Sequence, residues 1–299
     1  MDGILPIYKP RGMTSTDVVS QLRRQLHMRR VGHSGTLDPN VDGVLPIALG
    51  IATKAVPALM TAGKIYIGEM TFGFATTTED LDGEVVEHVA LERPFSRTEI
   101  EAAMAQMTGD IIQIPPMFSA VKVNGRRLYD YARAGDPVER PKRPVTIYTF
   151  KITDEPVWHE ATKTQTVRFE ASVSKGTYIR TLAVDTGRVL GVPAVMSDLT
   201  RIQSGGFGIG QTVSLDQLAD SDDPSQWVQP IEFAYPDLPQ YQLTEAQWED
   251  VQHGRFLRIG RTEPQLLLMY TGQMKAIYRY QSGHYQPETM FLSNQGPKA

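Results

Sequence analysis

The chain has 299 residues, of which 41% are hydrophobic, and this length is sufficient for more than one hydrophobic core. Cysteine is absent, which excludes disulfides and thiolate metal sites, and the six histidines are not spaced as metal ligands, so we expect neither a metal nor a cofactor. The sequence has no N-terminal signal pattern and no long uninterrupted apolar run, which predicts a cytoplasmic protein that does not enter a membrane.

The net charge of −4 is unevenly distributed along the chain. Residues 1–60 carry seven Lys or Arg against four Asp, and residues 115–144 carry seven Lys or Arg against three acidic side chains. Residues 216–250 carry nine Asp or Glu and no Lys or Arg. The two basic regions predict binding to a polyanion such as a nucleic acid, and the acidic segment is expected to face away from it.

Two helices are predicted from capping signals at their N-termini. Thr14 begins a run of cap-forming residues ahead of apolar residues at helical spacing, which favours a helix with Arg23 and Arg24 off its apolar face. Ser96, followed three positions later by Glu99, has the pattern of a capping box and predicts a second helix.

Residues 64–75 alternate in hydropathy as a strand does. Ile65 and Ile67 are predicted to share the core face of this strand, which leaves Tyr66 on the opposite, off-core face. An irregularity is expected at Gly68-Glu69, because the apolar residues change their phase there.

The remaining pattern predicts strands at residues 146–153 and 166–174, a helix at 179–191 with Arg180 in its first turn, and short strands within 255–281. Together these elements indicate an α/β (α+β) fold with a mixed or antiparallel sheet, followed by a small β module.

The expected division of the chain has three parts. Residues 1–213 are predicted to form the main domain, residues 214–239 an acidic linker region, and residues 240–299 the C-terminal module.

Asp38 is the most conspicuous single residue of the basic N-terminal region. Pro39 biases it away from helical geometry, and Gly35 permits a close approach of the backbone to a partner, so the carboxylate is predicted to project from a constrained loop. The dipeptide alone leaves a second interpretation open, in which Asp38 only caps a turn.

The string around Asp38 resembles the signature loop of the TruB family of tRNA pseudouridine synthases, and three further segments resemble motifs of the same family. The four segments are GHSGTLDPNVDGVL (32–45), KPRGMTSTDVV (9–19), QIPPMFSAVKVNGRRLYDYARAG (113–135) and SKGTYIRTLAVDTGRVLG (174–191). This chain departs from the family at Ser34, where Thr is common, and at residues 40–43, where LATG is common and Asp42 adds a carboxylate.

The resemblance implies a pseudouridine synthase catalytic domain followed by a PUA-like module that binds RNA. It also implies an isomerase that flips uridine 55 out of the T-arm loop of tRNA and converts it to pseudouridine. Asp38 matches the family's nucleophile, whose attack at C6 or at C1′ stays open, and Arg180 matches the cation beside it. Tyr66 matches the tyrosine that stacks on uracil and handles the C5 proton.

The resemblance further implies that His33, Tyr178 and Leu199 hold the flipped nucleotide. Phosphate contacts are expected from Lys9, Arg23, Arg24, Arg29, Arg30 and the basic residues of 122–143. The expected partner is the tRNA T-arm stem-loop, with no membrane, no obligate protein partner and a monomeric state.

Two other classes of protein fit part of the sequence. A phosphotransferase or phosphatase that forms an aspartyl-phosphate also needs an exposed Asp, but no DxD motif at the end of a strand accompanies Asp38. A non-catalytic RNA-binding protein accounts for the basic regions but has no use for Asp38, Tyr66 and Arg180 together.

Overall fold

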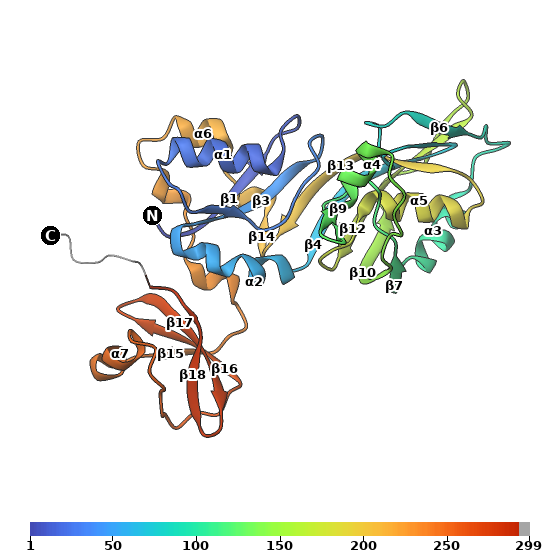
Figure 1. Cartoon of the computed structure of the whole chain (residues 1–299). Coiled ribbons are helices and arrows are strands. Elements are labelled where there is room, and N and C mark those ends of the chain that lie inside the picture. The colour runs from blue at the N-terminus through green and yellow to red at the C-terminus, as the bar shows by residue number, and fades with distance from the viewer. Residues whose placement is uncertain (293–299) are drawn as a thin grey trace. The chain divides into compact units, whose positions relative to one another are not determined.

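The computed structural model describes residues 1–292 (Figure 1). Residues 293–299, the end of the predicted C-terminal module, lie outside the described residues. The chain forms two compact units: the first contains Met1–Pro39, Val44–Met60 and the residues from Gly205 on, and the second contains Asn40–Gly43 and Thr61–Ser204. None of the helices in the described part of the chain is long and apolar enough to cross a membrane.

The first unit combines short helices with two groups of strands. Its elements are β1 (Gly3–Lys9), α1 (Ser15–Gln25), β2 (Val31–His33), β3 (Asp42–Leu49), η1 (Gly50–Ala55), α2 (Val56–Thr61), β14 (Phe207–Gly208), η2 (Ile209–Gln211), α6 (Leu215–Ala219), η3 (Pro224–Trp227), η4 (Ile231–Ala234), β15 (Gln240–Gln242), α7 (Glu245–Val251), β16 (Gln265–Tyr270), β17 (Gln273–Gln281) and β18 (His284–Met290).

The second unit is dominated by long strands. Its elements are β4 (Lys64–Phe72), β5 (Phe74–Thr76), β6 (Val85–His88), α3 (Arg97–Gln106), β7 (Gly109–Gln113), β8 (Lys122–Val123), β9 (Arg126–Arg127), α4 (Leu128–Ala134), β10 (Arg143–Ile152), β11 (Val157–His159), β12 (Thr164–Val173), α5 (Ile179–Val189) and β13 (Ala194–Ser204).

Helix α1 begins as predicted. Thr14 is its N-cap, and its side chain and that of Asp17 each accept a hydrogen bond from the other's backbone N–H, so the capping box is complete. The buried face of α1 packs on residues of β1, β2 and β3, and Leu215 and Leu218 from the acidic segment join the same core. The chain between residues 214 and 239 therefore contributes to the core of the first unit over part of its length.

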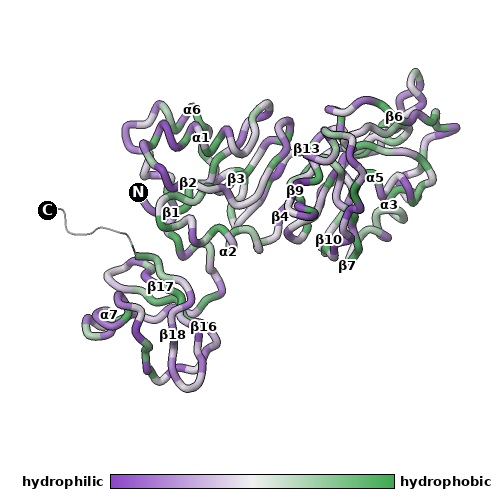
Figure 2. Tube along the Cα trace, viewed as in Figure 1, coloured by the Kyte–Doolittle hydropathy of each residue, from purple (hydrophilic) through white to green (hydrophobic). Residues whose placement is uncertain are grey.

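The C-terminal module is a four-stranded sheet in the order β15-β16-β17-β18, with an apolar run in β16 that can be followed in Figure 2. The prediction of a small β module is confirmed, but the strand expected at residues 255–260 is wrong. That segment is a loop in which Leu257 alone exchanges backbone hydrogen bonds with Tyr285. Gly254, at φ 69°, turns the chain before the segment, which then pairs with β18 at this one residue only.

The sheet of the second unit has the order β13-β4-β12-β10-β7, and every neighbouring pair in this order is antiparallel. Asp42 and Gly43, at the start of β3, pair in parallel with Thr200 and Arg201 of β13, so the large sheet is mixed. The predicted α/β fold with a mixed, largely antiparallel sheet is confirmed.

The prediction that Tyr66 lies on the off-core face of β4 is wrong. The strand pairs with β12 in continuous register from Lys64 to Phe72, without the expected irregularity, and the register shift in this region arises opposite it, at Ser197 of β13. Tyr66 is consequently on the covered face and is buried, whereas Ile67 is 42% exposed. The prediction assigned the two isoleucines to the buried face because they are apolar. Which face of a strand is buried depends instead on the elements that pack on the sheet.

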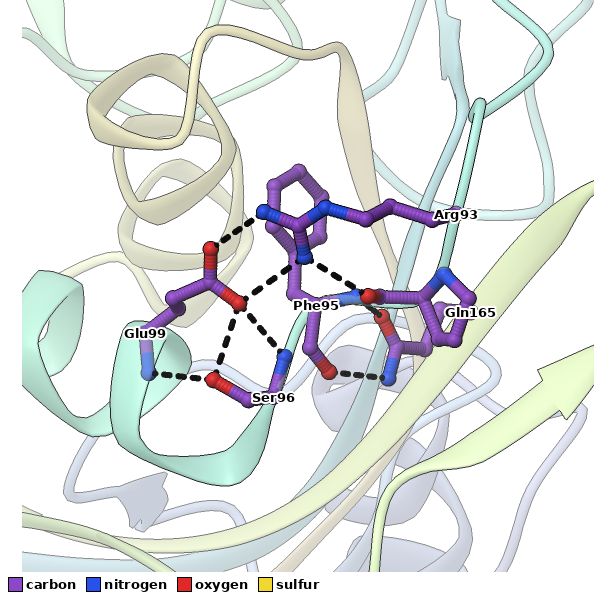
Figure 3. Close-up of polar contacts among 6 residues, drawn as sticks. Arg93, Phe95, Ser96, Glu99 and Gln165 are labelled. Atoms are coloured by element: carbon purple, nitrogen blue, oxygen red, sulfur yellow. Dashed lines mark hydrogen bonds and ion pairs between the residues drawn. The ribbon is translucent and has the colours of Figure 1, made fainter.

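Helices α3 and α5 contact the strands of this sheet. The apolar stripe predicted for α5 is confirmed, because Ile179, Leu182 and Ala183 are buried. Gly187 permits the close approach of α5 to β13, since a Cβ there would lie 2.5 Å from the Cβ of Ala194. Helix α3 begins with the predicted capping box of Ser96 and Glu99, drawn in Figure 3.

Candidate active site

The loop that carries Asp38 is held by hydrogen bonds on both sides of the carboxylate. Leu37 N–H donates to Oγ of Ser15 at 2.9 Å, and the carbonyl of Pro39 accepts from Gly12 N–H at 2.9 Å and from Lys9 Nζ at 3.0 Å. Asp38 itself is half-buried. Because its two neighbours are fixed, the backbone presents the carboxylate in a defined direction, as a nucleophile requires.

The prediction that Lys9 contacts a phosphate is wrong. Its side chain is completely buried, and its ammonium group donates to the carbonyl oxygens of Pro10, Met13 and Pro39 at 2.9, 2.7 and 3.0 Å. An ammonium group has three donors, so these bonds occupy all of them. Lys9 thus joins the KPRG segment to the Asp38 loop and does not face a ligand.

We expect Lys9→Met to lower the free energy of unfolding by about 2–4 kcal/mol, because three carbonyls lose a charged donor that is itself buried. Urea-induced unfolding measures this difference. Arg24→Met, which removes an exposed cation of α1, serves as the control and is expected to change stability by less than about 0.5 kcal/mol. Equal stability of the two variants would contradict the structural role of Lys9.

His33 ends β2 and is half-buried. Its Nδ1 accepts a hydrogen bond from Gly35 N–H at 3.3 Å. A nitrogen that accepts a hydrogen bond carries no proton, so this contact places the proton of the neutral ring on Nε2.

Tyr66 and Leu199 lie on the same face of the second unit's sheet, in two cross-strand pairs that are two residues apart along β4. Tyr66 pairs across the strands with Arg201, and Leu199 pairs with Gly68. A Cβ at Gly68 would lie 2.8 Å from Cδ1 of Leu199, so glycine is required for Leu199 to take this position. The structure therefore brings together two of the residues predicted to hold the base.

Two cations accompany Tyr66 on this face. Arg201 is 1% exposed, and Lys64 is buried two positions before Tyr66. Burial, together with the positive charges of Arg201 and Lys175, lowers the pKa of Lys64 to about 8.

Arg180 is buried at the start of α5, at 5% exposure, and is not a solvent-exposed arginine. Its Nη1 and Nη2 donate to the carbonyl oxygens of Thr78 and Phe118 at 2.8 and 3.0 Å. Its Nε lies 3.6 Å from Oδ2 of Asp80, which is also buried. The planar guanidinium is thus fixed by two segments of the second unit, the turn with Thr78 and Asp80 and the chain at Phe118.

Asp80 is the site residue that the sequence analysis missed. Its Oδ1 accepts from Oγ1 of Thr78 at 2.5 Å and from Asp82 N–H at 3.0 Å, so its carboxylate is held independently of Arg180. The segment TTTEDLD around it has the composition of an ordinary polar turn, so no local signal marked it. Only the folded chain shows that Asp80 faces Arg180.

The turn before Asp80 contains a second, half-buried carboxyl group. Glu79 has a left-handed backbone, with φ 67°, and accepts from Oγ1 of Thr181 at 2.7 Å. Burial raises the pKa of Glu79, against the opposing effect of this hydrogen bond and of Arg180 and Arg140. The hydrogen bond between Glu79 and Thr181 thus joins this turn, with its left-handed residue, to the first turn of α5.

Tyr178, the N-cap residue of α5, is half-buried and lies two positions before Arg180. Of the predicted site residues, His33 and Asp38 belong to the first unit, and Tyr66, Tyr178, Arg180 and Leu199 belong to the second.

Two family models match the chain. Residues 23–179 match the TruB family pseudouridylate synthase (N terminal domain), and residues 180–234 match the tRNA pseudouridylate synthase B C-terminal domain.

Curated relatives match over nearly the whole length. The tRNA pseudouridine synthase B of Lacticaseibacillus paracasei is 57% identical over 298 residues, and that of Latilactobacillus sakei subsp. sakei is 56% identical over 303 residues, with 99% of each chain covered in both cases. Among solved structures, a chain from the crystal structure of a Cbf5-Nop10-Gar1 complex has a TM-score of 0.72 and 27% identity, covering 97% of this chain and 85% of its own.

The family model and the curated relatives place the protein in the class of pseudouridine synthases, which are isomerases. The chain belongs to the TruB family of pseudouridylate synthases. The family membership and the enzyme class predicted from the four motifs are both confirmed.

Proposed function

We propose that this protein is a tRNA pseudouridine-55 synthase, which isomerises that uridine in the T-arm loop of tRNA. The observation that carries the proposal is the 57% identity, over nearly the full length, to a relative named tRNA pseudouridine synthase B. The buried pairing of Arg180 with Asp80 and the fixed Asp38 loop support it, because both provide defined polar groups for catalysis.

The reaction breaks the N1–C1′ bond of uridine, turns the uracil and joins C5 to C1′. N1 gains a proton and C5 loses one, so no group is added or removed. We assign the nucleophile to Asp38, and its attack either at C6 or at C1′ satisfies this role. Tyr66 stacks on the uracil and takes part in transfer of the C5 proton, and Arg180 supplies the positive charge that keeps a carboxylate ionised.

The flipped nucleotide is held by His33, Tyr178 and Leu199 in this proposal. The exposed cations at the end of α1 contact phosphates and position the RNA without reading its bases; they are Arg23, Arg24, Arg29 and Arg30. Residues 1–213 form the catalytic part, residues 214–239 the acidic connection, and residues 240–299 a PUA-like module that binds RNA. The protein acts in the cytoplasm as a monomer, without an obligate protein partner.

A single assay tests this function against the two other classes. The full chain is incubated with an unmodified T-arm stem-loop in EDTA and without ATP, and pseudouridine is detected by chemical derivatisation. We expect conversion of uridine 55 to pseudouridine. We expect no pseudouridine in a stem-loop that carries cytidine at position 55. A requirement for magnesium and ATP would favour phosphotransfer, and binding without conversion would favour an RNA-binding protein.

A further inference from the structure

The side-chain amide of Gln113 binds both main-chain groups of Tyr178. Gln113 is the last residue of β7 and is 2% exposed. Its Oε1 accepts from Tyr178 N–H at 2.8 Å, and its Nε2 donates to the Tyr178 carbonyl at 3.0 Å. The amide pairs with the backbone of Tyr178 as a neighbouring strand residue would.

The contact is made at the N-cap residue of a helix that has no side-chain cap. Tyr178 is the N-cap of α5 and makes no capping hydrogen bond with its own side chain. Its carbonyl accepts from Leu182 N–H at 3.1 Å as well as from Gln113, so both lone pairs have donors. The start of α5, including Arg180, is consequently held from the end of β7.

We propose that Gln113 is a positioning residue for isomerisation: its amide sets the backbone of Tyr178, and with it the direction in which Tyr178 and Arg180 meet the flipped uridine. The inference rests on the proposed function. Gln113 acts only through the main chain of Tyr178 and not by contact with Arg180 or with the base. Displacement of a catalytic group by about 1 Å can cost roughly 100-fold in rate, so a small shift of this backbone has a large effect.

The second unit contains a matched control. Gln165 of β12 is also 2% exposed, and its amide makes the same two bonds to the backbone of Phe95, at 2.8 Å from Phe95 N–H and 2.9 Å to the Phe95 carbonyl (Figure 3). Phe95 directly precedes Ser96, the N-cap of α3. The two glutamines thus have the same chemistry and burial, but only Gln113 holds residues of the candidate active site.

The experiment compares Gln113→Leu with Gln165→Leu in the full-length protein. Each substitution leaves one N–H and one carbonyl of a buried backbone without the amide, so both variants are expected to lose roughly 3–10 °C in melting temperature. At saturating T-arm stem-loop, single-turnover conversion should fall about 100-fold for Gln113→Leu and less than about threefold for Gln165→Leu. The Kd for the RNA should stay within about threefold of wild type for both.

Gln113→Glu keeps the acceptor for Tyr178 N–H and provides a measurement if Gln113→Leu does not fold. An ionised carboxylate has no donor for the Tyr178 carbonyl, whereas the neutral acid has one. The rate of Gln113→Glu relative to wild type at the same pH should therefore increase as the pH falls. A merely structural role of Gln113 gives no such pH dependence.

Equal losses of rate in Gln113→Leu and Gln165→Leu would overturn the inference, as would a wild-type rate in Gln113→Leu. So would a relative rate of Gln113→Glu that does not change with pH. Failure of the proposed function has a different signature, because wild-type protein would then form no pseudouridine, or Asp38→Ala would form it at the wild-type rate.

Discussion

Asp38→Ala is expected to slow pseudouridine formation by at least about 1,000-fold, or about 4 kcal/mol of barrier, while the Kd for tRNA changes by less than about threefold. The reason is chemical: the proposed reaction needs a nucleophile, and backbone hydrogen bonds at Leu37 and Pro39 hold the loop around Asp38. Single-turnover conversion of a T-arm stem-loop and filter binding measure the two quantities.

Asp42, the first residue of β3, provides the control for this variant. Asp42 lies four positions further on, and its Oδ1 accepts a hydrogen bond from Oγ1 of Thr200 at 2.6 Å. Asp42→Asn keeps that acceptor while removing the charge, so its turnover should stay within about threefold of wild type. If Asp38→Ala retains turnover within tenfold of wild type, Asp38 is not the nucleophile.

Arg180→Met is expected to reduce turnover at saturating RNA by about 100-fold or more, with little change in the Kd for RNA. The buried Asp80 carboxylate loses its cation, and the carbonyls of Thr78 and Phe118 lose their donors, which should also lower the free energy of unfolding by about 3–5 kcal/mol. Arg180→Lys keeps the charge but not the planar fork, so it should recover only part of the activity. Single-turnover rates and urea-induced unfolding measure these effects.

A double variant separates the two effects of Arg180. Arg180→Met combined with Asp80→Asn removes both buried charges, so much of the lost stability should return. Turnover should stay low, because no cation is then available to the nucleophile. Wild-type turnover of the double variant would instead mean that Arg180 only neutralises Asp80, and wild-type turnover of Arg180→Met with weaker binding would make Arg180 a phosphate contact.

The pH dependence of turnover is an independent test of the role predicted for Arg180. Without the cation, the nucleophilic carboxylate is protonated more easily, so it needs a higher pH to be ionised. Raising the pH should therefore restore part of the turnover of Arg180→Met and none of that of Asp38→Ala. A pH profile of Arg180→Met parallel to that of wild type would contradict the electrostatic role.

The sequence by itself determined the features that depend on local interactions. The capping boxes at Thr14 and Ser96 form between residues three positions apart, so the composition of a few residues was sufficient to predict where α1 and α3 begin. The α/β fold and the family were likewise predicted, because the motifs occur as short contiguous segments in a fixed order.

The tertiary structure alone decided the features that join distant segments. The partners of Arg180 lie about a hundred positions before it at Thr78 and Asp80, and Gln113 reaches Tyr178 across 65 positions. Lys9 was predicted to contact phosphate because a lysine in a basic region is usually exposed, yet the path of the chain surrounds it with carbonyls. Tyr66 was placed on the wrong face, because the packing of other elements on a sheet, and not the alternation within one strand, determines which face is buried.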